Sequence, residues 1–593
     1  MINDIDAALR AIDQASGGSG LFTNLDDATR QAIAREVSWA SVPGGELLFR
    51  CGDVGDGLYI VITGRLQAII EVPGGPAEVV GEISQGEVVG EMSLLTGDPR
   101  SLTIRAIRDT TLVKFSQEAF ARVIDRNPQA MLAVTRRIIV RLQQRNKGTR
   151  PPARVATIAV LTAGGGVLHR GAAERLAEAL ARVGSTQLLT GAIVEQATRG
   201  MDALAASRWL DDQERQHAYT LYLADATTTA WTARCVRQAD RALIVADGDT
   251  RPDHDRIVAW STDLSLRDGL PPVELVLLHA TTATPAGTAA WVAATAAVSH
   301  HHVCPTVAGQ YERVARFLTG RAVGLVLGGG GARGFAHIGV VRAFREAGVP
   351  IDAVGGTSMG AIIAGQCALD VDSDAMLALN RHHWILNNPL KDKTLPVVAL
   401  LACRRLDAMV AKMFGTVEID DLWRRYFAVS ADITNAELRV HRDGSLARAA
   451  RASMSLPGIA IPVHDNGALL IDGGVLNNLP ADIMKKVGGG PVVAVNVTPE
   501  KDLVVSGPYP GAISGWNLLL NRKHIKVPGI LSIIMRTTML ASTRERKRVA
   551  DDVDLLLNPS IEQFGMFDWD KLDAIAQIGY ECARDALERW KPA

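Results

Sequence analysis

A serine flanked by glycines is the residue in this chain best suited to covalent chemistry. The run Gly356-Thr357-Ser358-Met359-Gly360 has the spacing GxSxG and follows a short apolar stretch at 353–354. A sharp turn from a strand into a helix exposes such a serine, because the flanking glycines permit the tight geometry. The sequence therefore predicts Ser358 as the nucleophile of an acyl-transfer reaction.

A second glycine-rich run, at 328–334, could stabilise the negative charge that such an attack creates. Backbone amides at a turn from strand to helix point toward an anion. A dinucleotide site is a weaker interpretation of these glycines, because no acidic residue closes a strand about 20 residues later. We expect an oxyanion hole for Ser358 built from Gly329, Gly330, Gly331 and Arg333.

The predicted nucleophile needs a base, because a serine hydroxyl at its ordinary pKa is a poor nucleophile. Asp472 is the candidate, since an apolar strand at 469–471 delivers its carboxylate to a glycine turn. His337 and His464 are the rival bases. We interpret both histidines as structural, because an isolated histidine without a partner rarely marks catalysis.

Three motifs in order, GGGxRG, GxSxG and DGG, resemble those of the patatin-like phospholipases over about residues 321–590. The match includes Arg451-Ala452-Ser453 and Leu456-Pro457-Gly458, ahead of the Asp472 turn. The resemblance implies a serine esterase that hydrolyses acyl esters of phospholipids or lysophospholipids through a Ser-Asp dyad without histidine. By position, Ser358 would accept the acyl group, and Asp472 would take its proton and later activate water.

An anion site is predicted within residues 89–104. Gly90 permits close backbone approach, the residues after it can form a helical turn with free N–H groups, and Arg100 can clamp a phosphate bidentately. Glu91 would tolerate that phosphate if its carboxylate accepted a hydrogen bond from a ribose hydroxyl. The pattern indicates a nucleotide with a compact, singly charged phosphate.

This stretch resembles the phosphate-binding cassette of cyclic nucleotide-binding domains, and the resemblance extends over about residues 20–145. It implies that Glu91 binds the ribose and Arg100 the cyclic phosphate of a regulatory ligand, with cAMP favoured over cGMP. Leu102 stands where a small residue is usual. A roll that kept the fold and lost its ligand is the alternative. The binding residues carried over are Gly90, Glu91, Arg100, Ser101 and Thr103.

Three domains are expected to position these residues in a multidomain α/β protein. Short β-runs broken by glycine turns, followed by a long helix, predict an N-terminal β-roll for residues 1–150. Apolar strands that alternate with helices predict a middle α/β domain at 151–320, with the histidines at 300–302 in a linker. A second alternation at 321–593 corresponds to a patatin-like three-layer α/β/α domain. Its expected strands are 323–327, 353–354, 427–431, 469–471 and 492–497.

The order of roll, middle α/β domain and patatin-like domain is similar to that of the neuropathy target esterase group of lysophospholipases. The resemblance implies an esterase whose activity a cyclic nucleotide modulates. The alternative is a cyclic nucleotide sensor whose hydrolase-like domain is a weakly active or non-catalytic scaffold.

The composition excludes other classes of protein. With 47% hydrophobic and 21% charged residues, the chain has the composition of a globular protein. Its 63 Lys+Arg against 64 Asp+Glu give a formal net charge of -1, which argues against nucleic acid as a ligand. The six cysteines are far apart, which predicts reduced thiols, no metal site and a cytoplasmic location. A signal peptide and a membrane span are not expected.

Membrane contact, where it occurs, is therefore expected to be peripheral, at the inner membrane face. Between 516 and 548, apolar runs are interleaved with arginines and lysines, a pattern that suits the edge of an anionic bilayer. An amphipathic helix covering the sheet is the other interpretation. Both stay open.

Overall fold

A computed structural model describes residues 37–71, 78–126, 155–163, 168–253, 257, 271–498 and 552–590. The chain forms two compact units, one of residues 1–277 and 291–300 and one of 278–290 and 301–593, which are described separately. Two predicted features lie outside the described residues: the part of the long helix beyond residue 126 and the cationic segment at 516–548. Within the described ranges, no helix combines the length and the apolar character needed to cross a bilayer.

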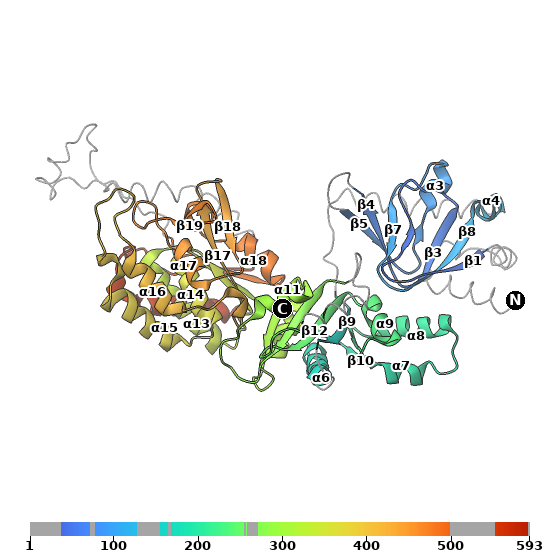
Figure 1. The fold of residues 1–593 in the computed structure, drawn as a ribbon, viewed down its shortest axis with the longest axis horizontal. Coiled ribbons are helices and arrows are strands. Elements are labelled where there is room, and N and C mark those ends of the chain that lie inside the picture. The colour runs from blue at the N-terminus through green and yellow to red at the C-terminus, as the bar shows by residue number, and fades with distance from the viewer. Residues whose placement is uncertain are drawn as a thin grey trace, which may run out of the picture. The chain divides into compact units, whose positions relative to one another are not determined.

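The first unit begins with the predicted antiparallel β-roll, drawn in blue in Figure 1. One sheet has the strand order β1-β8-β3-β6 and the other β2-β7-β4-β5. Strand β3 is apolar and buried along its whole length, which explains why it lies inside the roll. The strands are β1 (Val37–Val42), β2 (Leu47–Phe49), β3 (Gly57–Thr63), β4 (Leu66–Ile70), β5 (Glu78–Ile83), β6 (Val88–Val89), β7 (Thr103–Ala106) and β8 (Thr110–Ser116), and helices α3 (Glu91–Thr96) and α4 (Gln117–Arg126) accompany them.

The middle region contains a six-stranded sheet with the order β10-β11-β9-β12-β13-β14. Strands β10, β11, β9 and β12 pair in parallel, as the alternation of strands and helices predicts. The strands are β9 (Thr157–Thr162), β10 (Thr186–Thr190), β11 (Tyr219–Leu223), β12 (Arg241–Asp247), β13 (Val273–Leu278) and β14 (Ser299–Val303), and the helices are α6 (Leu168–Ala181), α7 (Gly191–Ala197), α8 (Ala203–Gln216), α9 (Ala230–Gln238) and α11 (Thr288–Thr295).

One expectation for this region is wrong. The histidines at 300–302 belong to β14, an edge strand, and not to a linker. His301 and His302 are buried. Backbone pairing at a sheet edge does not depend on apolar side chains, so a strand of this composition carries little sequence signal.

The second unit contains an eight-stranded mixed sheet with the order β19-β20-β17-β16-β15-β21-β22, in which β18 pairs with β17. Its centre is parallel, and β17, β18, β20 and β19 pair antiparallel at one side. The strands are β15 (Gly324–Leu327), β16 (Ala353–Gly356), β17 (Arg425–Asp432), β18 (Glu437–His441), β19 (Val463–Asp465), β20 (Ala468–Asp472), β21 (Val492–Val495) and β22 (Leu555–Leu557).

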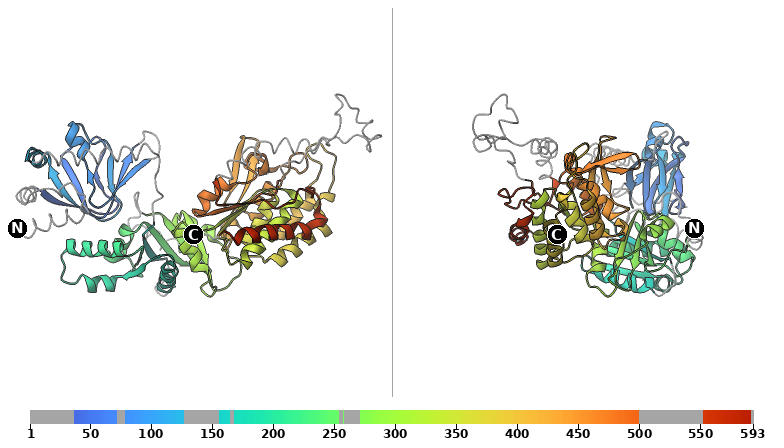
Figure 2. Two further views of the ribbon diagram at one scale, coloured as in Figure 1. Left: turned by 180° about the vertical axis from the view of Figure 1, so that it is seen from behind. Right: turned by 60° about the vertical axis from the view of Figure 1, so that its left-hand side comes forward.

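Helices cover both faces of this sheet, which gives the expected α/β/α layers (Figure 2). Leu325 and Leu327 face one hydrophobic core, whereas Val326 between them faces the other, because successive side chains of a strand alternate. The first core packs under α13 (Ala336–Glu346), α14 (Met359–Ala368), α16 (Arg404–Phe414), α17 (Leu446–Ser453) and α22 (Leu572–Leu587), and the second packs under α18 (Ala481–Gly488).

The register of β15 against β16 brings the two glycine motifs to one sheet edge. Leu327, the last residue of β15, lies opposite Gly356, the last residue of β16. Because parallel strands end on the same side, the glycine loop after β15 and the serine turn after β16 start at the same level. This edge is where the candidate site lies.

Candidate functional site

Ser358 lies at the turn between β16 and α14 in a strained backbone conformation, with φ 56° and ψ -124°. A side chain at Gly360 would collide with the carbonyl oxygen of Leu327, so the helix can start this close to β15 only with glycine there. Non-glycine residues at positive φ cluster at functional sites, where the surrounding structure holds them. This is the geometry of a nucleophile elbow.

Two buried serines after the catalytic turn hold both predicted catalytic residues by hydrogen bonds. The Ser358 amide donates to the Ser453 Oγ at 2.9 Å. The Asp472 amide donates to the Ser455 carbonyl oxygen, also at 2.9 Å. One short segment at the end of α17 thus fixes the elbow and the strand that carries the carboxylate. Sequence reasoning did not identify this role.

The Asp472 carboxyl is buried at the end of β20, and its Oδ1 accepts a hydrogen bond from the Gly474 amide at 2.8 Å. Its Oδ2 has no hydrogen-bond partner in the described part of the chain. Burial raises the pKa of this carboxyl to about 6, although the nearby Ser358 hydroxyl and the Gly474 amide lower it. Because Oδ2 has no other partner there, it is available to accept the proton of Ser358. Catalytic hydrogen bonds are often long before substrate binds.

The glycine loop after β15 lies against the nucleophile. A Cβ at Gly329 would lie 3.1 Å from the Cβ of Ser358 and 2.6 Å from the Asn478 Oδ1. The Gly329 amide already donates to the Asn478 carbonyl oxygen at 3.4 Å. Among the described residues, the amides of Gly330 and Gly331 have no acceptor, and neither has the amide of Met359 at the start of α14.

Arg333 does not reach into this space as a free donor. Its Nε donates to the Phe564 carbonyl oxygen at 2.7 Å, and the neighbouring Ala332 amide donates to the Met566 carbonyl oxygen at 2.8 Å. Gly331 has a φ of 60°, and a side chain there would collide with Met566. The loop is therefore attached to the segment around residue 565.

The two rival histidines lie apart from the reaction centre or are already bonded. His337 is fully buried, and its Nε2 donates to the Gly328 carbonyl oxygen at 2.8 Å. Desolvation lowers its pKa to about 4, so it is neutral near pH 7 and supports the glycine loop. His464 is exposed on β19.

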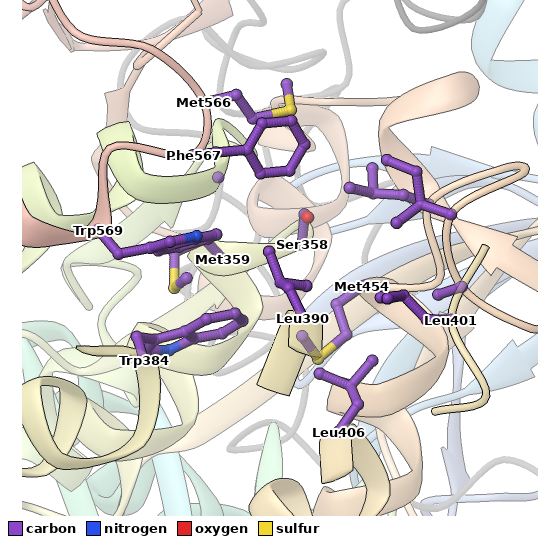
Figure 3. Close-up of a pocket in the computed structure, with 14 residues that line it drawn as sticks. Ser358, Met359, Trp384, Leu390, Leu401, Leu406, Met454, Met566, Phe567 and Trp569 are labelled. Atoms are coloured by element: carbon purple, nitrogen blue, oxygen red, sulfur yellow. The ribbon is translucent and has the colours of Figure 1, made fainter. Parts of the chain in front are cut away.

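An apolar pocket opens beside Ser358 and holds about 480 Å³ including its mouth. Figure 3 shows the Ser358 hydroxyl among apolar side chains, with Trp384 and Trp569 together on one side. These two rings stack with centroids 4.3 Å apart. The lining residues are Gly331, Ser358, Met359, Trp384, Leu390, Leu401, Leu406, Met454, Leu456, Ile459, Ala460, Met566, Phe567 and Trp569.

The contact between Ser453 and the elbow can be tested by mutation. Ser453→Ala leaves the buried Ser358 amide without an acceptor, which costs about 1–3 kcal/mol and loosens the turn. We expect kcat to fall by roughly 10–100-fold, measured on a soluble ester. Ser455→Ala is the matched control, because it keeps the backbone bond to Asp472. Equal kcat in wild type and Ser453→Ala would show that the elbow does not need this bond.

In the β-roll, the predicted binding residues lie in the connection between β6 and β7 and, for Thr103, at the start of β7. Gly90 has a φ of 86°, and α3 follows it directly. Arg100 is buried: its Nη1 donates to the Gly90 carbonyl oxygen at 3.0 Å, and its Nη2 donates to Asp56 Oδ1 at 2.7 Å and to the Gly57 carbonyl oxygen at 2.8 Å. The Arg100 guanidinium is thus held in a fixed position.

The remaining predicted residues differ in their surroundings. Glu91 is buried, and Ser101 is exposed. Thr103 is buried, with its hydroxyl donating to Glu71 Oε1 at 2.8 Å and accepting from the Cys51 amide at 2.9 Å. Asp56, which holds the Arg100 guanidinium, also pairs with Lys114. In the described residues of the chain, no cluster of potential ligands could hold a metal ion.

Three family models match the chain in sequence. A cyclic nucleotide-binding domain matches residues 39–127, a Neuropathy Target Esterase family P-loop like domain matches 154–320, and a patatin-like phospholipase matches 325–485. The patatin match contains Ser358 and Asp472, and the nucleotide-binding match contains Arg100.

Two solved structures match about a quarter of the chain. A cyclic nucleotide-binding domain from Methylobacillus flagellatus is 23% identical with a TM-score of 0.22, covering 24% of this chain and 80% of its own. The regulatory subunit of a cAMP-independent protein kinase A from Trypanosoma brucei, bound to cAMP, is 19% identical with a TM-score of 0.21, covering 23% and 47%.

Curated relatives extend the similarity to almost the whole chain. Patatin-like phospholipase domain-containing protein 6 from Homo sapiens is 34% identical over 93% of this chain, and neuropathy target esterase sws from Drosophila melanogaster is 32% identical over 96%. The alignments span 45% and 44% of these relatives' lengths. The chain therefore contains a cyclic nucleotide-binding domain, a Neuropathy Target Esterase family P-loop like domain and a patatin-like phospholipase domain, and over these domains it is similar to the neuropathy target esterase group.

Proposed function

We propose that this chain is a serine esterase that hydrolyses acyl esters of phospholipids or lysophospholipids, with Ser358 as nucleophile and Asp472 as base. One observation carries the proposal. Among the described residues, the strained serine turn and Gly331 line an apolar pocket, the buried Asp472 carboxyl beside Ser358 has one oxygen without a hydrogen-bond partner, and the amides of Gly330 and Gly331 have no acceptor. Nucleophile, base, oxyanion donors and acyl site are the parts that ester hydrolysis requires.

In the proposed reaction, Asp472 accepts the Ser358 proton while the serine oxygen bonds to the ester carbonyl carbon. The carbonyl oxygen becomes an oxyanion, and the amides of Gly330, Gly331 and Met359 are the donors free to stabilise it. The intermediate expels the alcohol, which takes the proton from Asp472. Water then attacks the acyl-serine and gives a proton to Asp472. As the bond between the Ser358 Oγ and the acyl carbon breaks, Asp472 returns this proton to Oγ and the fatty acid leaves.

Gly329 and Arg333 have a supporting role in this proposal. Their donors bond to the Asn478 and Phe564 carbonyl oxygens, so the amide of one and the Nε of the other hold the loop in shape. Asn478 also donates from Nδ2 to the Gly329 carbonyl oxygen at 3.1 Å. These contacts fix the loop before substrate binds, which is the condition for electrostatic preorganisation.

A panel of monoacyl and diacyl phospholipids with different headgroups tests the proposed activity. The full chain is incubated with each lipid, with and without cAMP or cGMP, and the released fatty acid is measured. We expect release by wild type and none by Ser358→Ala. Absence of release from every lipid, together with nucleotide binding, would instead support a cyclic nucleotide sensor with a non-catalytic scaffold.

We further propose that a cyclic nucleotide, with cAMP as the first candidate, binds the roll through Arg100 and Glu91 and modulates the esterase. The rigidly held guanidinium of Arg100, behind Gly90 and α3, supports this role. A planar guanidinium is well matched to a phosphate, because it donates two parallel hydrogen bonds.

Arg100→Ala is expected to weaken cAMP binding roughly 100-fold, because charge-assisted hydrogen bonds contribute about 1.5–3 kcal/mol. Isothermal titration calorimetry of the full chain measures the loss. Arg50→Ala is the matched control, since Arg50 is an exposed arginine of the same roll. Undiminished binding by Arg100→Ala would remove Arg100 from the phosphate site.

A further inference from the structure

An exposed apolar hairpin, residues 392–403, lies between η3 (Pro389–Lys391) and α16. The antiparallel bridge between Lys393 and Leu401 closes its base, and the Thr394 amide donates to the Leu400 carbonyl oxygen at 3.0 Å. Its tip presents Leu395, Val397 and Val398, which are 80%, 82% and 67% exposed. Adjacent apolar side chains held outward on a hydrogen-bonded turn are typical of an interaction site.

The same segment forms part of the catalytic pocket. Leu401 lines the pocket beside Ser358, as do Leu390 before the hairpin and Leu406 after it (Figure 3). The Leu401 amide donates to the Ile459 carbonyl oxygen at 2.9 Å, which fixes the hairpin to the opposite pocket wall. Phe567, another lining residue, is 44% exposed. One hairpin thus carries both an exposed apolar tip and a buried residue, Leu401, that lines the pocket.

Cations flank the apolar tip on both sides in the sequence. Lys391, Lys393, Arg404 and Arg405 are exposed, and Arg404 has 83% of its side chain in solvent. The single carboxylate among them, Asp392, is buried, accepts from the Arg405 amide at 3.2 Å and lies 3.4 Å from Arg404. The flanks of the hairpin therefore carry an excess of positive charge.

We propose that the hairpin docks this chain on a bilayer that contains anionic phospholipid and lets a lipid pass from the bilayer into the pocket. The inference rests on the proposed function, because it names the source of the substrate. The tip enters the acyl region while the lysines and arginines meet the headgroup phosphates. An apolar tip between cations matches the acyl region and the headgroup phosphates of an anionic bilayer. An apolar groove on a protein would offer the cations no negative charge.

Flotation of the full chain with vesicles tests the proposal. All proteins carry Ser358→Ala, so that the lipid is not consumed, and the vesicles contain phosphatidylcholine with or without phosphatidylserine. The double variant Val397→Asp, Val398→Asp is expected to bind roughly 100-fold more weakly, because two side chains no longer enter the apolar layer. Ile433→Asp is the matched control, since Ile433 is exposed elsewhere in the same unit.

A second variant tests the charge. Lys391→Gln with Lys393→Gln is expected to weaken binding to vesicles with phosphatidylserine about 30-fold, and to leave binding to phosphatidylcholine alone unchanged. Added salt should reduce the difference, since exposed charges are screened.

Three results would overturn the proposal. The parent chain does not float with the vesicles, the double aspartate variant floats as well as the parent, or Ile433→Asp loses as much vesicle binding as the double aspartate variant does. Light scattering of the protein without vesicles tests whether the tip binds a second copy of the chain instead. A dimer that dissociates in the double aspartate variant would show that it does. Failure of the proposed esterase is distinguishable: if the Ser358→Ala parent floats with vesicles but the wild-type chain releases no fatty acid from them, the activity alone is contradicted.

Discussion

Ser358→Ala is expected to lower ester hydrolysis by roughly 10⁴-fold or more. The serine Oγ is the atom that bonds to the carbonyl carbon, and the buried donors and carboxylate around it cannot form an acyl-enzyme without it. Release of p-nitrophenol from a short acyl ester measures the loss, because this substrate needs no membrane.

Ser373→Ala is the control for this change, since Ser373 starts α15 (Ser373–Asn380), away from the pocket lining. Both variants should unfold at temperatures close to that of the wild type. Hydrolysis by Ser358→Ala within a few-fold of wild type would place the chemistry elsewhere.

Asp472→Asn is expected to remove activity by roughly 10⁴-fold, because an amide cannot accept the serine proton. The amide oxygen can still accept the hydrogen bond from Gly474, so the strand should keep its position. A pH profile gives an independent check. Wild-type kcat/KM should rise tenfold per pH unit below about 6 and level off above it, because the base must be ionised.

The same substitution is expected to stabilise the second unit. The Asp472 pKa is about 6 in the folded chain because burial disfavours the charged form, against about 3.9 in an unfolded chain. The native state therefore binds the proton more tightly, and stability falls as the pH rises from about 4 to about 6. Asp472→Asn should gain on the order of 2–3 kcal/mol above pH 6 and nothing below about pH 4.

Thermal unfolding of both proteins across this pH range measures the gain. Activity lost together with stability at pH 8 would indicate that Asp472 is a structural carboxylate. Activity lost with stability gained is the signature of a strained catalytic group.

The parts of the site that local spacing determines could be predicted from sequence. The GxSxG turn and the apolar strand before Asp472 each lie within a few residues, so their geometry follows from local backbone rules. Ser453 could not be predicted, because its partner is 95 residues away and the contact depends on how α17 packs. The stacked pair Trp384 and Trp569 is formed by segments even more distant in the chain.

The donors of the glycine loop show the same limit. Sequence identifies a run of amides but not which of them bond within the protein. The Gly329 amide donates to the Asn478 carbonyl oxygen, whereas the Met359 amide, which sequence reasoning did not consider as a donor, has no acceptor within the described ranges. Strands with apolar residues, such as β11 and β13, were predictable, whereas β14 was missed because its histidines carry no strand signal.

Reaction of the intact chain with a fluorophosphonate ester, followed by mass spectrometry of the peptides, tests the central claim most directly. A single phosphonyl adduct on the Ser358 Oγ, formed at pH 8 and strongly slowed in Asp472→Asn, is the result we predict. An unmodified Ser358, or labelling at an undiminished rate without the carboxylate, would contradict a nucleophile activated by Asp472.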